Sequence, residues 1–96
     1  MTDVSTIKNK VIPIAKEYGV KKMYLFGSYA KGNATENSDV DLLIEKGKPM
    51  SLLKISGMRQ SLSEALNLSV DLITTAGIDK SFFDYINGTE IVLYEE

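Results

Sequence analysis

Hydrophobic residues recur near the start of the chain with the spacing of an α-helix. Positions separated by three or four residues fall on one helical face, and the apolar residues with this spacing are Val4, Ile7, Val11, Ile14 and Tyr18. The pattern predicts a helix over residues 5–18, capped by Ser5 or Thr6 and ended by Gly19. Pro13 lies inside this range and removes a backbone hydrogen bond, so we expect two short helical pieces.

The remaining apolar runs predict four strands and two further helices. Glycine, proline and polar turns bound the expected strands, which cover residues 23–26, 39–45, 70–74 and 90–94. A second helix is expected from a Ser51 cap onward, with an apolar stripe of Leu52, Ile55, Met58 or Arg59, Leu62 and Leu66. A short helix from residue 78 or 79 to 86 precedes the last strand. The order α, β, β, α, β, α, β indicates an α/β (α+β) fold.

The composition narrows the possible functions. With 96 residues the chain is expected to form a single domain over residues 1–96. A net charge of −2 gives no broad positive surface for DNA or RNA. The chain has no cysteine and no histidine, which excludes disulfides, Cys/His zinc sites and histidine-based triads. We see no signal peptide and no apolar run as long as a membrane span, which is consistent with the cytoplasm.

Asp39 and Asp41 are the first candidates for chemistry. One residue apart on a strand, they face the same side of the sheet, and two ionised carboxylates there repel each other. A divalent cation relieves this repulsion, and Mg²⁺ typically takes one or two protein carboxylates together with phosphate oxygens and water. The pair therefore indicates a metal site, although two solvated aspartates at a strand entrance would produce the same pattern.

Ten residues separate the Gly27-Ser28 step from Asp39. Glycine lets the backbone approach a ligand closely, and Ser28 can donate to a phosphate from its hydroxyl and its N–H. Lys31 either adds positive charge near the phosphates or is a solvated lysine. Gly-Ser alone also marks an ordinary turn. The pattern as a whole is more informative: a strand, Gly-Ser, a connector, Asp-x-Asp and a second strand. It could bring a phosphate-binding turn and two metal-binding carboxylates to one edge of a sheet.

Asp71 is the third candidate carboxylate. It interrupts an apolar run, Val70 to Ile73, in which a charge needs a partner or a metal. If this strand neighbours the second, Asp71 can complete a carboxylate triad and help deprotonate an acceptor hydroxyl. An aspartate at a strand edge that pairs with a lysine is the alternative.

The stretch from Gly27 to Ile44 closely resembles the nucleotidyltransferase superfamily signature of Gly-Ser, ten residues and Asp-x-Asp. The positions that fit the fuller family pattern are Gly27, Ser28, Ala30, Gly32, Ser38, Asp39, Asp41 and Leu42. The short chain and its Val70-Asp71-Leu72 run resemble the minimal (MNT) nucleotidyltransferases. The resemblance covers nearly the whole chain and implies the polymerase-β-like palm, a mixed sheet of about four strands flanked by helices.

The resemblance also implies roles for individual residues. Gly27 and Ser28 would hold the nucleoside triphosphate, ATP, while Asp39 and Asp41 would bind two Mg²⁺ ions. Asp71 would be the third carboxylate, at the metal and the acceptor hydroxyl. The implied reaction is in-line attack of a hydroxyl on the α-phosphorus with departure of pyrophosphate. Lys31 stands where many relatives have arginine. Lysine has the same charge but cannot form the two parallel hydrogen bonds that an arginine guanidinium makes to a phosphate.

MNT proteins are often encoded beside an HEPN-domain protein, and many such pairs are toxin–antitoxin systems. There the MNT protein is the antitoxin and can transfer AMP from ATP to a tyrosine of the HEPN RNase. The resemblance therefore implies a Mg²⁺-dependent protein adenylyltransferase with an HEPN toxin as its partner in a hetero-oligomer. Larger family members hold base and acceptor with an extra C-terminal domain, so we expect a partner or second subunit to supply those contacts.

Two other functions remain compatible with the sequence. One is an antitoxin that neutralises its partner by binding alone, which fits the modest size of the chain. The other is a transferase for a small molecule such as an aminoglycoside, which would need an acceptor-binding domain. Phe82, Phe83 and Tyr85 could form a partner interface, but packing against the sheet is the favoured interpretation.

Overall fold

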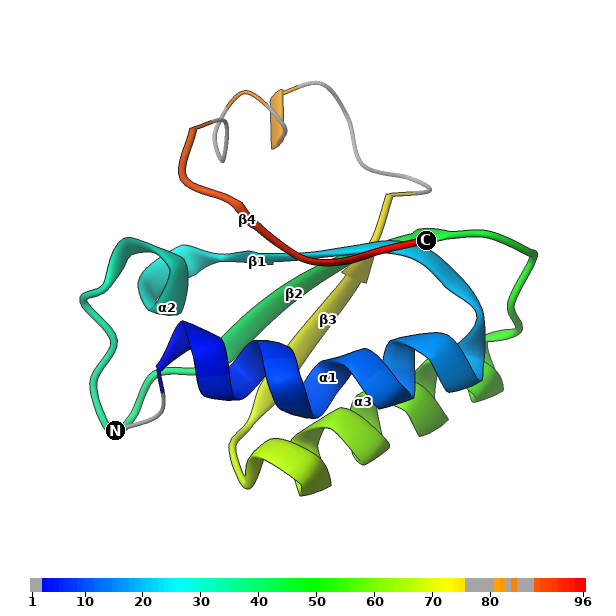
Figure 1. The fold of residues 1–96 in the computed structure, drawn as a ribbon, viewed down its shortest axis with the longest axis horizontal. Helices are drawn as coiled ribbons and strands as arrows, with labels where there is room; N and C mark the ends of the chain where they lie inside the picture. The colour runs from blue at the N-terminus through cyan, green and yellow to red at the C-terminus, as the bar shows by residue number, and fades with distance from the viewer. Residues whose placement is uncertain (1–2, 76–80, 83, 85–87) are drawn as a thin grey trace.

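The computed structural model describes residues 3–75, 81–82, 84 and 88–96. Its helices and strands are, in chain order, α1 (Val4–Tyr18), β1 (Val20–Phe26), α2 (Gly27–Lys31), β2 (Val40–Lys46), α3 (Leu52–Leu66), β3 (Val70–Thr74) and β4 (Ile91–Glu95). The strands form one mixed sheet, and α1 packs beside α3 (Figure 1). The predicted fold class, a mixed four-stranded sheet flanked by helices, is confirmed.

The order of strands in the sheet is β3-β2-β1-β4. β1 runs antiparallel to both of its neighbours, whereas β2 and β3 are parallel. A hairpin turn cannot join two parallel strands, and α3 makes this connection. The end of β1 and the starts of β2 and β3 consequently lie at the same edge of the sheet.

The first helix is capped by Asp3, not by Ser5 or Thr6 as the sequence indicated. Asp3 Oδ1 accepts a hydrogen bond from the backbone N–H of Thr6 at 2.8 Å. The same interaction lowers the pKa of the Asp3 carboxyl. The helix begins one residue earlier than predicted, because Asp3 lies upstream of Ser5 and caps a helix equally well. The spacing of apolar residues does not determine which residue caps the helix.

The predicted break at Pro13 is also wrong, because α1 is continuous from Val4 to Tyr18. Proline removes the hydrogen bond to the carbonyl four residues earlier, which belongs to Asn9. Both Pro13 and Asn9 are exposed, so water can satisfy that carbonyl and the helix need not end. The opposite side of α1 is buried through Ile7, Val11 and Ala15.

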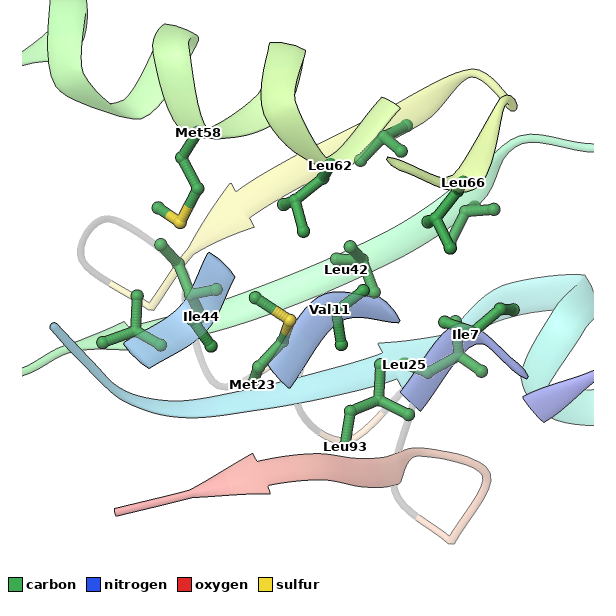
Figure 2. Close-up of a cluster of buried hydrophobic side chains, with 14 of the residues drawn as sticks. Ile7, Val11, Met23, Leu25, Leu42, Ile44, Met58, Leu62, Leu66 and Leu93 are labelled. Carbon is green, nitrogen blue, oxygen red and sulfur yellow. The ribbon is translucent and has the colours of Figure 1, made fainter. Parts of the chain in front are cut away.

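Side chains from α1, α3 and all four strands form the main core between the helices and the sheet (Figure 2). Ser51 caps α3 as predicted, by accepting a hydrogen bond from Lys54 N at 3.1 Å. The predicted stripe holds from Met58 onward, but Leu52 is 84% exposed and Leu53 is 83% exposed. The core residues labelled in Figure 2 are Ile7, Val11, Met23, Leu25, Leu42, Ile44, Met58, Leu62, Leu66 and Leu93.

A second, smaller cluster lies apart from the main core. Phe26 and Leu43 are its buried members, and partly buried Tyr24, Ile73 and Phe82 pack against them. The rings of Phe26 and Phe82 meet edge to face, with centroids 5.4 Å apart. Phe82 therefore contributes to packing, as favoured from the sequence.

Some strand boundaries differ from those predicted. β1 begins at Val20, three residues before the expected start, and β4 covers Ile91–Glu95. β2 begins at Val40, so Asp39 lies just outside the strand, while β3 has the expected bounds. Phe83, Tyr85 and most of the helix predicted to end at residue 86 fall outside the described residues. No helix in the described ranges is long and apolar enough to cross a membrane.

Leu62 and Leu53 offer a matched test of the core in α3. Leu62 is fully buried, so Leu62→Ala should lower the free energy of unfolding by about 2–5 kcal/mol. Leu53→Ala deletes the same atoms at an exposed position and should change it by less than about 0.5 kcal/mol. Urea denaturation followed by circular dichroism measures both, and equal losses would contradict this packing.

Candidate active site

Three strand ends bring the predicted site residues to one edge of the sheet. Asp41 is paired with Phe26 of β1 on one side and with Asp71 of β3 on the other. Gly27 and Ser28 directly follow Phe26. The structure thus places β3 next to β2, which was the condition for Asp71 to join the aspartate pair.

Gly27 and Asp41 lie in close contact. Gly27 has φ +74°, a conformation that side chains disfavour. A Cβ at this position would collide with Asp41 Oδ2 and would lie 3.1 Å from Asp41 Cγ. The Asp41 carboxylate therefore occupies the space that a side chain at position 27 would need. Glycine is required here both by backbone conformation and by the neighbouring carboxylate.

The short helix α2 continues the chain after Gly27. It is five residues long and ends before Gly32, which has φ +79°. Tyr29 is buried in the main core and anchors α2 there, which assigns this side chain to packing. Ser28 is half-buried, and its carbonyl accepts a hydrogen bond from Asn33 N at 3.1 Å. Lys31, the last residue of α2, is exposed.

A hydrogen-bonded turn precedes Asp39. The N–H of Thr35 donates to Ser38 Oγ at 2.9 Å, and the N–H of Ser38 donates to the Thr35 carbonyl at 3.0 Å. On the other side of Asp39, Val40 N donates to the carbonyl of Ser69 at 2.9 Å. Asp39 is therefore held from both sides although it lies outside β2. We did not predict this turn, whose signal is two hydroxyl residues three positions apart.

The three aspartates interact electrostatically. Burial raises the pKa of the Asp41 carboxyl, and the negative charges of Asp71 and then Asp39 raise it further. Asp41 is half-buried, whereas Asp39 and Asp71 are exposed. The site consequently concentrates negative charge around one partly desolvated carboxylate.

These residues fit a hard divalent cation. Mg²⁺ prefers oxygen ligands and usually takes one or two carboxylates, with phosphate oxygens and water completing its shell. A cation would also offset the repulsion that raises the pKa of Asp41. Within the described ranges, no three acidic side chains are already arranged as a metal-binding group. The full set of Asp39, Asp41 and Asp71 as metal ligands stays a prediction.

Comparison with known families agrees with this geometry. Residues 8–92 match the family model of the nucleotidyltransferase domain. The chain belongs to the nucleotidyltransferase family. The matched range includes every residue predicted for the site.

Known relatives and structures resemble this nucleotidyltransferase over most of its length. A relative from Methanocaldococcus jannaschii, provisionally named a protein adenylyltransferase, is 39% identical over 84 residues, which cover 88% of this chain and 90% of the relative. A structure provisionally named a minimal nucleotidyltransferase has a TM-score of 0.80 at 26% identity, covering 94% of this chain and 95% of that one.

A third similarity is to a complex between a tri-AMPylated HEPN toxin and an MNT antitoxin from Shewanella oneidensis. The TM-score is 0.75 at 20% identity, and the match covers 97% of this chain and 73% of that chain. At this identity the likeness establishes the fold alone.

Gly27 and Gly32 provide a matched pair of substitutions. Both have positive φ, but a Cβ at Gly32 meets nothing within 4 Å. Gly32→Ala should therefore cost only backbone strain, about 1 kcal/mol. Gly27→Ala adds the displacement of Asp41 and should lower the free energy of unfolding by at least about 1 kcal/mol more. Urea denaturation of the two variants measures the difference, and equal losses would refute the close contact.

The raised pKa of Asp41 predicts a pH-dependent gain in stability for Asp41→Asn. A carboxyl whose pKa is higher in the folded state destabilises the fold as pH rises through that pKa, and the full penalty is present at pH 7. Asparagine carries no such penalty, so the variant should melt at a higher temperature than wild type at pH 7. The gain should disappear as pH falls below 3.8, the ordinary value.

Thermal melts from pH 3 to pH 8 measure this effect, since about 1 kcal/mol shifts the melting temperature of a domain this size by roughly 4–8 °C. Glu36→Gln removes an exposed carboxylate from the neighbouring loop and is the control. A gain for Asp41→Asn that is the same at every pH would contradict the electrostatic origin.

Proposed function

We propose that the protein transfers AMP from ATP to a hydroxyl of a partner protein, and that this modification neutralises a toxin of the HEPN class. The observation that carries the proposal is the pairing of Asp41 with Asp71 on one side and Phe26, followed by Gly27-Ser28, on the other. This pairing places the backbone that is a candidate for binding phosphate next to a cluster of carboxylates, and AMP transfer requires both.

Each site residue has a role in this proposal. Gly27 and Ser28 bind the triphosphate at the end of β1, and Lys31 adds positive charge near it. Asp39 and Asp41 hold Mg²⁺, two ions in the complete site. When bound, Mg²⁺ supplies positive charge that offsets the ionised carboxylates and the phosphate oxygens. The contact of Asp41 with Gly27 keeps its carboxylate beside the phosphate-binding backbone.

Asp71 acts on the acceptor side of the site. Its carboxylate takes the proton of the acceptor hydroxyl as the hydroxyl oxygen bonds to the α-phosphorus. The bond from the α-phosphorus to the bridging oxygen breaks at the same time, and pyrophosphate leaves. Asp71 is exposed and lies on β3, an edge strand of the sheet, so a protein side chain can approach it.

The relatives suggest what the acceptor is. The name of the Methanocaldococcus jannaschii relative indicates a protein acceptor, and the Shewanella oneidensis complex pairs an MNT antitoxin with an AMPylated HEPN toxin. We accordingly take a tyrosine hydroxyl of an HEPN toxin as the acceptor, in a cytoplasmic hetero-oligomer of the two proteins.

Neutralisation by binding alone is the second candidate function. It requires a surface that contacts the toxin and needs neither ATP nor Mg²⁺. In that case the carboxylates would be dispensable for protection against the toxin.

The intact mass of the HEPN partner separates the two functions. After incubation with this protein, ATP and Mg²⁺, the partner should gain one or more AMP units. Asp39→Asn removes a metal-binding charge at an exposed position and should slow this gain by about 100-fold or more. Glu36→Gln, in the same loop, is the control and should leave the rate unchanged.

Two outcomes would contradict transfer of AMP. The first is a stable complex with the partner and no gain of mass under any condition. The second is full protection of cells by Asp39→Asn. Either result would favour neutralisation by binding.

A further inference from the structure

Glu90, the residue before β4, has an unusual environment. Its Oε2 atom is enclosed and has no hydrogen-bond partner, a state found for no other side-chain atom in the described part of the chain. Enclosed polar atoms nearly always have partners, and one without a partner calls for a cause such as a functional role. Glu90 as a whole is only half-buried, so part of its side chain is open to solvent although Oε2 is enclosed.

The register of the sheet places Glu90 in line with the active site. β1 and β4 pair antiparallel through Tyr24 with Val92 and Leu25 with Ile91. One further step in this register sets Glu90 opposite Phe26, which is itself paired with Asp41. Asp71, Asp41 and Phe26 therefore form one row across β3, β2 and β1, and Glu90 continues this row from the residue directly before β4.

Side chains in one such row point to the same face of the sheet. This is the face of Phe26 and its small cluster, away from the main core. Glu90 lies two strand spacings from Asp41, roughly 10 Å. In Figure 1, β4 begins beside the end of β1 that leads into α2. Glu90 and Asp71 are thus on opposite sides of Asp41.

The chemistry of a nucleotide determines which part of it can meet Glu90. The ionised triphosphate offers only acceptor oxygens and repels a carboxylate. The sugar hydroxyls and the amine of the base are hydrogen-bond donors, which a carboxylate accepts well. In the proposed function the phosphates bind at Gly27-Ser28 and the acceptor hydroxyl binds at Asp71. The nucleoside is therefore the part of the nucleotide that can lie toward β4.

We propose that Glu90 binds the nucleoside of the nucleotide substrate by accepting a hydrogen bond from a sugar hydroxyl or from the amine of the base. This inference rests on the proposed function and adds a residue that selects the nucleotide. Glu90 touches the substrate away from the reacting atoms and is a binding residue.

Calorimetric titration with ATP and Mg²⁺ tests the proposal directly. Glu90→Ala should weaken ATP binding by about tenfold or more, because a hydrogen bond to a charged group is lost. Glu95→Ala is the control, since Glu95 is the last residue of β4, at the end of the strand away from Glu90, and pairs with Lys22 at 3.9 Å. Inorganic tripolyphosphate, which lacks the nucleoside, should bind wild type and both variants equally.

The outcomes separate this inference from the proposed function. ATP binding that is equal in wild type and Glu90→Ala overturns the inference and leaves the proposed function standing. A wild-type protein that binds neither ATP nor tripolyphosphate overturns both. An equal loss of tripolyphosphate binding in Glu90→Ala would show that Glu90 acts on the phosphates and would also overturn the inference.

Nucleotide analogues identify the donor. The 2′-deoxy and 3′-deoxy forms of ATP each lack one sugar hydroxyl, and inosine triphosphate carries oxygen in place of the amine. The analogue that lacks the partner of Glu90 should bind wild type and Glu90→Ala equally. If all three analogues keep the full tenfold difference, the proposed hydrogen bond is refuted.

Thermal stability distinguishes binding from a structural role. Because Glu90 Oε2 has no partner within the protein, Glu90→Ala should not lower the melting temperature of the ligand-free protein. A clear decrease in melting temperature together with weaker ATP binding would assign Glu90 to folding and overturn the proposal.

Discussion

The Asp41 carboxylate lies against the backbone of Gly27 and beside the charges of Asp71 and Asp39. This crowding is unfavourable by itself, because partial burial and like charges both disfavour the ionised form. The surrounding fold nevertheless imposes it. The ladder between β1 and β2 runs up to the pair of Phe26 with Asp41, directly before Gly27, and β3 pairs with the other side of β2. A fold that enforces such repulsion is suited to a ligand that supplies positive charge.

The sequence predicted a structural feature correctly where the spacing of hydrophobic residues and the chemistry of neighbouring residues indicate the same element. Hydrophobic patterns were sufficient for the four strands and for α1 and α3, and the spacing from Gly27 to Asp41 correctly indicated that these two residues lie close together. Asp3 was missed because aspartate caps a helix as well as serine or threonine does. Pro13 was misjudged because the carbonyl that it leaves without a partner belongs to an exposed residue of α1. Leu52 fits the helical period yet is exposed, because the first turn of α3 extends beyond the core.

Other features of the site could not be derived from spacing. The contact between Gly27 and Asp41 joins residues on different strands, and it depends on the register of β1 against β2. Glu90 carries no local signal at all, since one acidic residue before a strand is common. Only the pairing of β4 with β1 shows that it directly precedes a strand beside the one that carries Phe26. Pairings between distant segments are set by tertiary packing, which composition and period do not encode.

The parallel pairing of β2 with β3 has a consequence for how the site holds together. Asp41 belongs to the antiparallel unit of β1 and β2, and Asp39 directly precedes β2, whereas Asp71 lies on β3. Asp71 is held beside them by the β2–β3 ladder at the edge of the sheet, so local opening of β3 would separate Asp71 from Asp41 while β1 and β2 stay paired. Partial unfolding of this kind occurs in proteins at free energies below that of global unfolding. The pair of Asp41 and Asp71 can thus be separated by a local fluctuation that leaves the contact between Gly27 and Asp41 intact.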